Sequence, residues 1–198
     1  MIRKRLPLIL SEMRTGISCT AWALVACATL LASPSSATTI IVDNNNGNNV
    51  PGDTFFFTGT WASATTTTGG LFYGNDFLTH RGSQGSATAK WQPTIAAAGY
   101  HEVFVRHTTG SSRTTAAQFI VDYDGGSQTV LVNQSTNGGQ WISIGTFLFA
   151  AGTAGAVRLN PDTGALIFTV ADAAKWESAP LPTPTKVSTW GKLKSFYR

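Results

Sequence analysis

The sequence predicts an all-β protein built as a sandwich, and three observations support this prediction. From Thr39 onward, short apolar or alternating runs are separated by clusters of Gly, Asn, Asp and Thr, the pattern of strands and turns. No window before the C-terminal tail has the spacing of an amphipathic helix. Ten short strands in one domain are typical of a β-sandwich. The expected strands lie at residues 39–42, 54–57, 71–73, 87–92, 100–107, 117–123, 128–133, 140–149, 156–159 and 166–176.

Residues 1–37 have the layout of a secretory signal peptide. A basic segment precedes an apolar run at residues 17–32, and small side chains at Ser35 and Ala37 suit cleavage before Thr38. The remaining 161 of the 198 residues contain no stretch apolar enough to span a bilayer. The product is therefore expected to be secreted, without a transmembrane span. Alternatively, Leu24-Val-Ala-Cys27 is a lipobox and Cys27 anchors a lipoprotein.

Charge and cysteine content exclude two kinds of function. The chain has 14 Lys and Arg against 10 Asp and Glu, but 8 of the basic residues and one acid lie in residues 1–37 and 179–198. The body between them has a net charge of −3, so no broad cationic face is available for a nucleic acid. Both cysteines, Cys19 and Cys27, lie in the signal peptide, which leaves the mature body without disulfide or thiolate chemistry.

Two glycine-containing segments are expected to close hairpins between strands. Asp124-Gly125-Gly126 separates two alternating runs, and both glycines accept a positive φ without a steric penalty. We expect Asn137-Gly138-Gly139 to have the same role.

Alternation along residues 100–107 assigns their side chains to two faces. The face expected in the core holds His101, Val103, Val105 and His107, and the outward face holds Glu102, Phe104 and Arg106. An exported domain without disulfides also needs large apolar side chains inside. The rings and aliphatic groups expected there are Trp61, Trp91, Trp141, Ile144, Phe147 and Phe149.

Eight segments, in order and spacing, resemble the golvesin C-terminal and xanthan-lyase carbohydrate-binding-like domain. They are Ile40-Ile-Val-Asp-Asn44, Thr58-Gly-Thr-Trp61, Phe72-Tyr-Gly-Asn75, Gly85-Ser-Ala-Thr-Ala-Lys-Trp91, Gly99-Tyr-His-Glu-Val-Phe-Val-Arg106, Val132-Asn-Gln134, Asn137-Gly-Gly-Gln-Trp-Ile-Ser-Ile-Gly145 and Val170-Ala-Asp-Ala173. The resemblance implies a jelly-roll-like antiparallel β-sandwich, found attached to secreted bacterial enzymes, that binds carbohydrate or a surface without catalysis. At His107 the family often has an aromatic residue instead.

Sequence motifs for catalysis are missing. The chain has no Gly-x-Ser-x-Gly elbow, phosphate-binding loop or His-Glu-x-x-His pair. Its acids form no close pair of the glycosidase kind, and along one strand His101 and His107 would lie about 20 Å apart. We therefore expect a secreted, non-catalytic module that binds carbohydrate or cell-surface polysaccharide. The alternative is a structural or adhesive surface protein attached by its C-terminal tail.

Aromatic and polar residues outside the expected core predict where a sugar would bind. Tyr73 lies beside Gly74-Asn75-Asp76, where a loop edge would expose its hydroxyl. Sugar rings stack their C–H faces on aromatic rings, while their hydroxyls need polar partners. The predicted ligand-binding residues are Tyr73, Asn75, Asp76, Phe104, Arg106 and Arg113.

The run from Asp43 to Asn49 allows two interpretations. The first is an Asn-rich turn, since Asx side chains bond their own backbone and Gly47 falls one place too early for an EF-hand loop. The second follows from the resemblance, because the termini of jelly-roll carbohydrate-binding modules often converge on a structural Ca²⁺. Asp43 and Asp172 would then be metal ligands, and any metal is expected to be calcium.

Residues 179–198 differ in kind from the body, residues 38–178. A Pro-rich linker at 180–185 precedes a basic segment in which Trp190, Leu193 and Tyr197 would share one helical face. Such a tail would contact a membrane, a wall polymer or a partner protein. The alternative is a disordered end.

Overall fold

Two antiparallel β-sheets form the body of the protein. The computed structural model describes residues 37–67, 71–82, 86–161 and 167–181. Residues 1–36 of the predicted signal peptide, with Cys27, and the predicted tail beyond residue 181 lie outside this description. No helix in the described ranges is long and apolar enough to cross a membrane.

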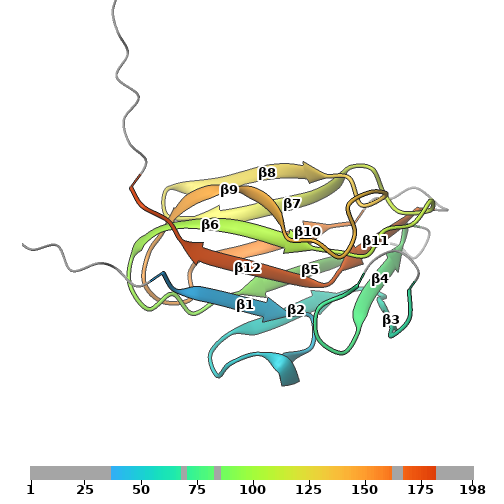
Figure 1. Cartoon of the computed structure of the whole chain (residues 1–198), viewed down its shortest axis with the longest axis horizontal. Helices are drawn as coiled ribbons and strands as arrows, with labels where there is room; N and C mark the ends of the chain where they lie inside the picture. Colours follow the sequence, from blue (N-terminus) through green and yellow to red (C-terminus); the bar gives the residue numbers. More distant parts are fainter. Residues whose placement is uncertain (1–36, 68–70, 83–85, 162–166, 182–198) are drawn as a thin grey trace, which may run out of the picture. The chain divides into compact units, whose positions relative to one another are not determined.

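The strand order within each sheet defines the sandwich (Figure 1). The four-stranded sheet has the order β1 (Thr39–Asp43), β12 (Ala173–Ser178), β6 (Gly99–Arg106) and β9 (Ile142–Phe149). The five-stranded sheet has the order β2 (Thr54–Thr58), β5 (Thr88–Gln92), β10 (Ala156–Asn160), β7 (Ala117–Tyr123) and β8 (Gly126–Val132). A third sheet lies at one end and consists of β11 (Phe168–Ala171), β4 (Phe77–Arg81) and β3 (Ala62–Ala64). The predicted jelly-roll-like antiparallel β-sandwich is confirmed.

The core lies between the two larger sheets and contains rings from both. Trp91 on β5 contacts Phe55 and Phe119, with ring centroids 5.3 and 6.1 Å apart. Across the sandwich, Tyr123 on β7 contacts Phe147 on β9 at 5.3 Å. Because burying a large apolar side chain contributes about 1.5–3 kcal/mol, this shared core holds the two sheets together.

The predicted faces of β6 are confirmed by burial. His101, Val103, Val105 and His107 are buried, and Glu102, Phe104 and Arg106 are partly exposed. Trp91, Ile144, Phe147 and Phe149 belong to the core as expected, and Trp61 packs partly buried against it.

Two strand predictions were wrong, and two strands were missed. Residues 71–73 are loop, while β3 and β4, which flank this loop, were not anticipated. The expected strand at 166–176 divides at Asp172 into β11 and β12, which belong to different sheets. The Asp172 carbonyl accepts the Asn44 N–H at 2.9 Å and the Trp91 indole N–H at 3.2 Å, so this peptide is bonded outside any strand ladder.

One of the two predicted hairpins forms. β7 and β8 pair up to Tyr123 and Gly126, and Gly125 has φ 112°. The prediction for 137–139 was wrong, because this segment connects β8 in one sheet to β9 in the other. Its Gly139 N–H donates to the His107 carbonyl at 2.9 Å, which ties the crossing to the end of β6.

Candidate functional site

Two carboxylates distant in the sequence meet at one end of the four-stranded sheet. Asp43 ends β1, and Asp172 precedes β12, its neighbour. Both side chains are fully buried. The Asn44 N–H donates to the Asp172 carbonyl at 2.9 Å, so the two chain segments are fixed beside each other.

A third carboxylate, Asp76, joins this pair from the loop before β4. Its Oδ1 accepts the Asn44 amide at 3.0 Å, and its Oδ2 accepts the Ser63 hydroxyl at 2.6 Å. The neighbouring Asn75 amide donates to Asn48 Oδ1 at 3.1 Å. We call Asp43, Asp76 and Asp172 the acidic cluster. In the structure, Asn75 and Asp76, both predicted to bind ligand, bond to protein groups.

The Asn-rich run forms the turn that the first interpretation predicted. Asn45 caps the short 3-10 helix η1 (Asn46–Asn48) by accepting the Gly47 N–H at 3.0 Å. Asn46 Oδ1 accepts the Phe55 N–H at 2.7 Å, which attaches the turn to β2. The Asn48 amide donates to Asp43 Oδ2. The turn therefore also serves the acidic cluster, so the two interpretations are compatible.

Burial sets the electrostatics of the cluster. It raises the pKa of Asp43 from 3.8 to about 6, while the Asn48 amide partly opposes the shift. It raises the pKa of Asp172 from 3.8 to about 8; the Tyr73 N–H and Arg106 lower this pKa, and the charges of Asp43 and Asp76 raise it. Buried like charges disfavour ionisation. In the absence of a cation, the pKa of about 8 keeps the Asp172 carboxyl largely protonated near neutral pH.

The donor set fits a hard cation. Asp43 Oδ1 and Asn44 Oδ1 are buried and form no hydrogen bond within the described residues, although such atoms are normally paired. Carboxylate and amide oxygens are the ligands that Ca²⁺ takes. In the described ranges no three His, Cys, Asp or Glu side chains are arranged to hold a metal, so a cation here would need amide oxygens besides Asp43 and Asp172.

Gly74 explains why the loop approaches the cluster so closely. Its φ is 66°, and a Cβ on this residue would overlap the Asp43 carboxylate and the Asn48 amide. Any other residue here would have to displace the buried Asp43 carboxylate.

Three aromatic rings gather beside the acidic cluster on the outer face of the four-stranded sheet. Tyr73 and Trp141 have ring centroids 5.7 Å apart. Lys175 Nζ lies 4.1 Å from the Phe104 ring centroid and 5.1 Å from that of Trp141. Arg106 Cζ lies 5.7 Å from the Trp141 centroid. We call Tyr73, Phe104 and Trp141 the aromatic platform.

The acidic cluster holds the platform in place. The Tyr73 N–H donates to both oxygens of Asp172, at 3.0 and 3.2 Å. Arg106 Nε lies 4.0 Å from Asp172 Oδ2 and donates to the Leu71 carbonyl at 3.3 Å. The structure thus brings together Tyr73, Phe104 and Arg106 of the predicted ligand residues.

Trp141 was wrongly assigned to the core. It is only partly buried and lies among the platform rings. Alternation contained the signal, because Ile142 and Ile144 face the core and the residue before Ile142 must face outward. Lys175 was not considered, yet it pairs with Phe104 in the β6–β12 register.

Arg113 lies apart from the platform. Its Cζ is 5.6 Å from the Phe168 ring centroid and 5.9 Å from that of Phe77. Burial lowers the pKa of its guanidinium. It lines an open pocket of about 540 Å³ with Thr79 and Ser112. Arg113 and Arg106, with six residues between them in the sequence, therefore lie at different sites.

The fold and this site define a β-sandwich module with an aromatic surface supported by buried acids. Residues 40–178 match the family model of the Golvesin C-terminal domain. The chain belongs to that family, as its sequence motifs indicated.

Solved and curated relatives show where such a module occurs. The xanthan lyase of Bacillus sp. (strain GL1) is 33% identical over 107 residues, 52% of this chain and 12% of that protein. The Paenibacillus xanthan lyase structure has a TM-score of 0.63 at 33% identity, over 72% of this chain and 13% of that chain. A family 35 carbohydrate binding module from an environmental isolate has a TM-score of 0.47 at 16% identity, over 73% of this chain and 96% of that chain. The present chain thus matches only a small part of each lyase.

Proposed function

We propose that this protein is an exported, non-catalytic module that binds polysaccharide at the aromatic platform. The observation that carries the proposal is the meeting of Tyr73, Phe104 and Trp141 beside Arg106 and Lys175. Aromatic faces stack on the C–H faces of sugars, and the cationic side chains donate to hydroxyl or carboxylate oxygens. Three rings from separate chain segments on one face suit a ligand of several linked sugars.

The relatives support this class of ligand. Two proteins named xanthan lyases contain a region similar to this module as 12% and 13% of their length. A small non-catalytic domain in such a protein would hold the polymer near a separate active site. We extend that role to the present chain and take xanthan as the first polymer to test.

The acidic cluster is proposed to hold a structural Ca²⁺. Asp43, Asp172 and the unpartnered Asn44 Oδ1 would supply oxygen ligands. The ion would neutralise buried carboxylates, and Asp172 would then present a fixed charge to the Tyr73 N–H and to Arg106. In this arrangement calcium acts on sugar binding indirectly, by fixing the loop that carries Tyr73.

Export and attachment remain predictions from the N- and C-terminal sequence. The secreted protein should begin at Thr38, which its intact mass would show, whereas a diacylglycerol adduct on Cys27 would support the lipoprotein alternative. The adhesive alternative assigns attachment to the tail. Truncation after Ala179 would abolish surface attachment in that case and leave it unchanged if the platform is responsible.

Binding to immobilised xanthan and to neutral polysaccharides tests the proposal. Tyr73→Ala and Trp141→Ala should each weaken binding by about ten-fold or more, which corresponds to about 1.4 kcal/mol. Leu131→Ala is the matched control, because Leu131 is an exposed apolar residue on the other sheet. Melting curves should show the variants and the unaltered protein folded at the temperature of the assay, which would exclude unfolding as the cause of weaker binding. Unchanged affinity in both platform variants would refute the assignment of this face.

A further inference from the structure

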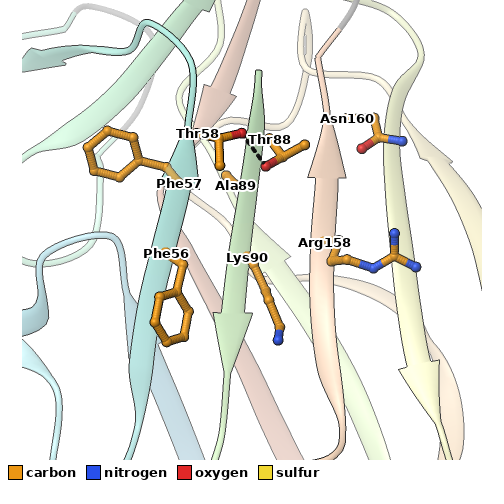
Figure 2. A pocket seen from close by; sticks show the side chains of 8 residues that line it. All are labelled: Phe56, Phe57, Thr58, Thr88, Ala89, Lys90, Arg158 and Asn160. Atoms are coloured by element: carbon orange, nitrogen blue, oxygen red, sulfur yellow. Dashed lines mark hydrogen bonds between the residues drawn. The ribbon is translucent and has the colours of Figure 1, made fainter. Parts of the chain in front are cut away.

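A shallow depression of about 210 Å³ lies on the outer face of the five-stranded sheet, over β2, β5 and β10 (Figure 2). Successive strand residues point to opposite faces of a sheet. The side chains of this outer face are therefore largely polar or charged, whereas their strand neighbours on the inner face belong to the apolar core. Among the side chains that line it are Phe56, Thr58, Thr88, Lys90, Arg158 and Asn160.

Strand register arranges these side chains in two rows. Phe56 pairs with Lys90, and Lys90 pairs with Arg158, so these three form one row across the strands. Thr58 pairs with Thr88 in the next row, and their hydroxyls bond each other at 2.8 Å. Neighbouring strands lie about 4.8 Å apart and rows about 6.8 Å apart. The surface therefore offers an aromatic and cationic row beside a row of hydroxyl groups.

The charges of this face are incompletely paired. Arg158 donates from Nε and one terminal nitrogen to Asp122, at 2.6 and 2.7 Å, which leaves its other terminal nitrogen available. Lys90 forms no ion pair within the described ranges, and its Nζ lies 5.8 Å from the Phe56 ring centroid. This face thus has a surplus positive charge in a body whose net charge is −3.

Phe56 provides the apolar part of the surface. Its side chain is 49% exposed, although it lies in the middle of a strand. A second copy of the chain is a poor occupant, because a two-fold contact centred here would place Lys90 and Arg158 against their own copies, and burying like charges is costly. A carboxylate-bearing ligand with an apolar face and hydroxyl groups matches all three features.

We propose that this depression is a second binding site, specific for acidic polysaccharide. A sugar ring stacks on Phe56, its carboxylate accepts from Lys90 and from the free side of Arg158, and hydroxyls of the chain bond Thr88 and Asn160. The inference rests on the proposed polysaccharide function but assigns a separate face and a charge requirement.

Surface plasmon resonance on the full secreted protein tests the site. The immobilised probes are xanthan, polygalacturonate and hyaluronan, each beside its carboxyl-reduced form. Lys90→Met keeps the apolar stem and removes the charge, Lys90→Arg restores the charge, and Phe56→Ala removes the ring. Leu131→Ala is an exposed control on the same sheet that does not line the depression.

We expect at least one acidic polymer to bind about ten-fold or more tightly than its reduced form. That preference should be lost in Lys90→Met, retained in Lys90→Arg and unaffected in Leu131→Ala. Phe56→Ala should weaken binding to the acidic polymer.

Measuring the platform variant Trp141→Ala in parallel distinguishes failure of the second site from failure of the platform. Binding that depends on Trp141 but not on Phe56 or Lys90 refutes the second site alone, and so does equal binding of acidic and reduced polymers. If no polymer binds, both proposals fail. Sedimentation in which Phe56→Ala converts a dimer to a monomer would assign the face to self-association instead.

Discussion

The two outer faces of the sandwich present aromatic and cationic groups in different states. On the four-stranded sheet, the side chains of Arg106 and Lys175 are 16% and 13% exposed and already lie over the platform rings. On the five-stranded sheet, the outer face around the depression, which we call the open face, has Phe56 49% exposed. Ordering a long side chain on binding costs about 0.5–1.5 kcal/mol. The cationic side chains of the platform are already ordered by folding. At the open face, ligand binding itself would have to order the side chains.

The faces also differ in what supports them. The platform depends on a loop whose Tyr73 N–H bonds to the buried Asp172. The open face depends on the register of β2, β5 and β10. Disturbing the acidic cluster should therefore alter the platform and leave the open face intact, and the following measurements test this separation.

The largest effect is expected at Trp91, whose ring packs in the core beneath both faces. Its indole N–H also donates to the Asp172 carbonyl at 3.2 Å. Trp91→Ala should lower the free energy of unfolding by about 3–5 kcal/mol, measured by urea denaturation, and abolish binding at both faces. Trp91→Phe should retain most of the packing and lose mainly the hydrogen bond. An unchanged urea midpoint in Trp91→Ala would contradict the assignment of this ring to the core.

The second effect concerns calcium and pH. Because the pKa values of Asp43 and Asp172 are raised to about 6 and about 8, their contribution to stability without calcium is fully present below about pH 4 and is lost as pH rises through these values. Calcium binding requires ionised carboxylates, so its stabilisation should grow over the same range. At 100 times its Kd, calcium should contribute about 2.7 kcal/mol at high pH.

Melting temperature in calcium and in EDTA, from pH 4 to pH 9, measures this linkage. Asp172→Asn should abolish the calcium response and flatten the pH dependence in EDTA, because the group with the larger pKa shift is removed. Its binding at the open face should match that of the unaltered protein. Identical melting curves with and without calcium at pH 8 would remove the ion from this site.

A smaller stability effect is expected for Trp141→Ala. Trp141 is partly exposed and its ring pairs with Tyr73, and an aromatic pair contributes about 0.5–1.5 kcal/mol beyond burial. Urea denaturation should give a loss well below that of Trp91→Ala, while xanthan binding falls strongly. A loss as large as that of Trp91→Ala would show that the platform is part of the core.

The smallest stability effects belong to the open face. Phe56→Ala changes an exposed position and Lys90→Met a partly exposed one on the sheet surface, and surface substitutions usually alter stability by no more than about 0.5 kcal/mol. Their unfolding free energies should therefore match that of Leu131→Ala. A large loss in Phe56→Ala would mean that this ring packs against the protein and is not available to a ligand.

Local patterning predicted the parts of the fold that local physics determines. The faces of β6 follow from alternation, and the β7–β8 hairpin follows from Asp124-Gly125-Gly126. Residues 71–73 have the composition of a strand, but their backbone N–H at Tyr73 bonds to the Asp172 carboxylate and not to a neighbouring strand. That partner lies 99 positions away, beyond any local pattern.

The candidate site was predicted in part for the same reason. Phe104 and Arg106 lie on one strand face, so alternation placed them together. Arg113 is close to them in sequence, but the turn at 110–113 directs it toward Phe168 in the third sheet. Trp141 directly precedes β9, which lies in the four-stranded sheet because the chain crosses between the sheets after β8. The expected hairpin at 137–139 would have kept both strands in one sheet.

The pairing of the first and last strands determines how the module is tethered. Ser178 donates its N–H to the Thr38 carbonyl at 3.0 Å, so the start of β1 and the end of β12 lie side by side (Figure 1). Asp43 lies at the opposite end of β1. A longer protein or a surface can therefore hold the domain by either terminus, or by both as an insertion, while the acidic cluster and its platform point away from the point of attachment.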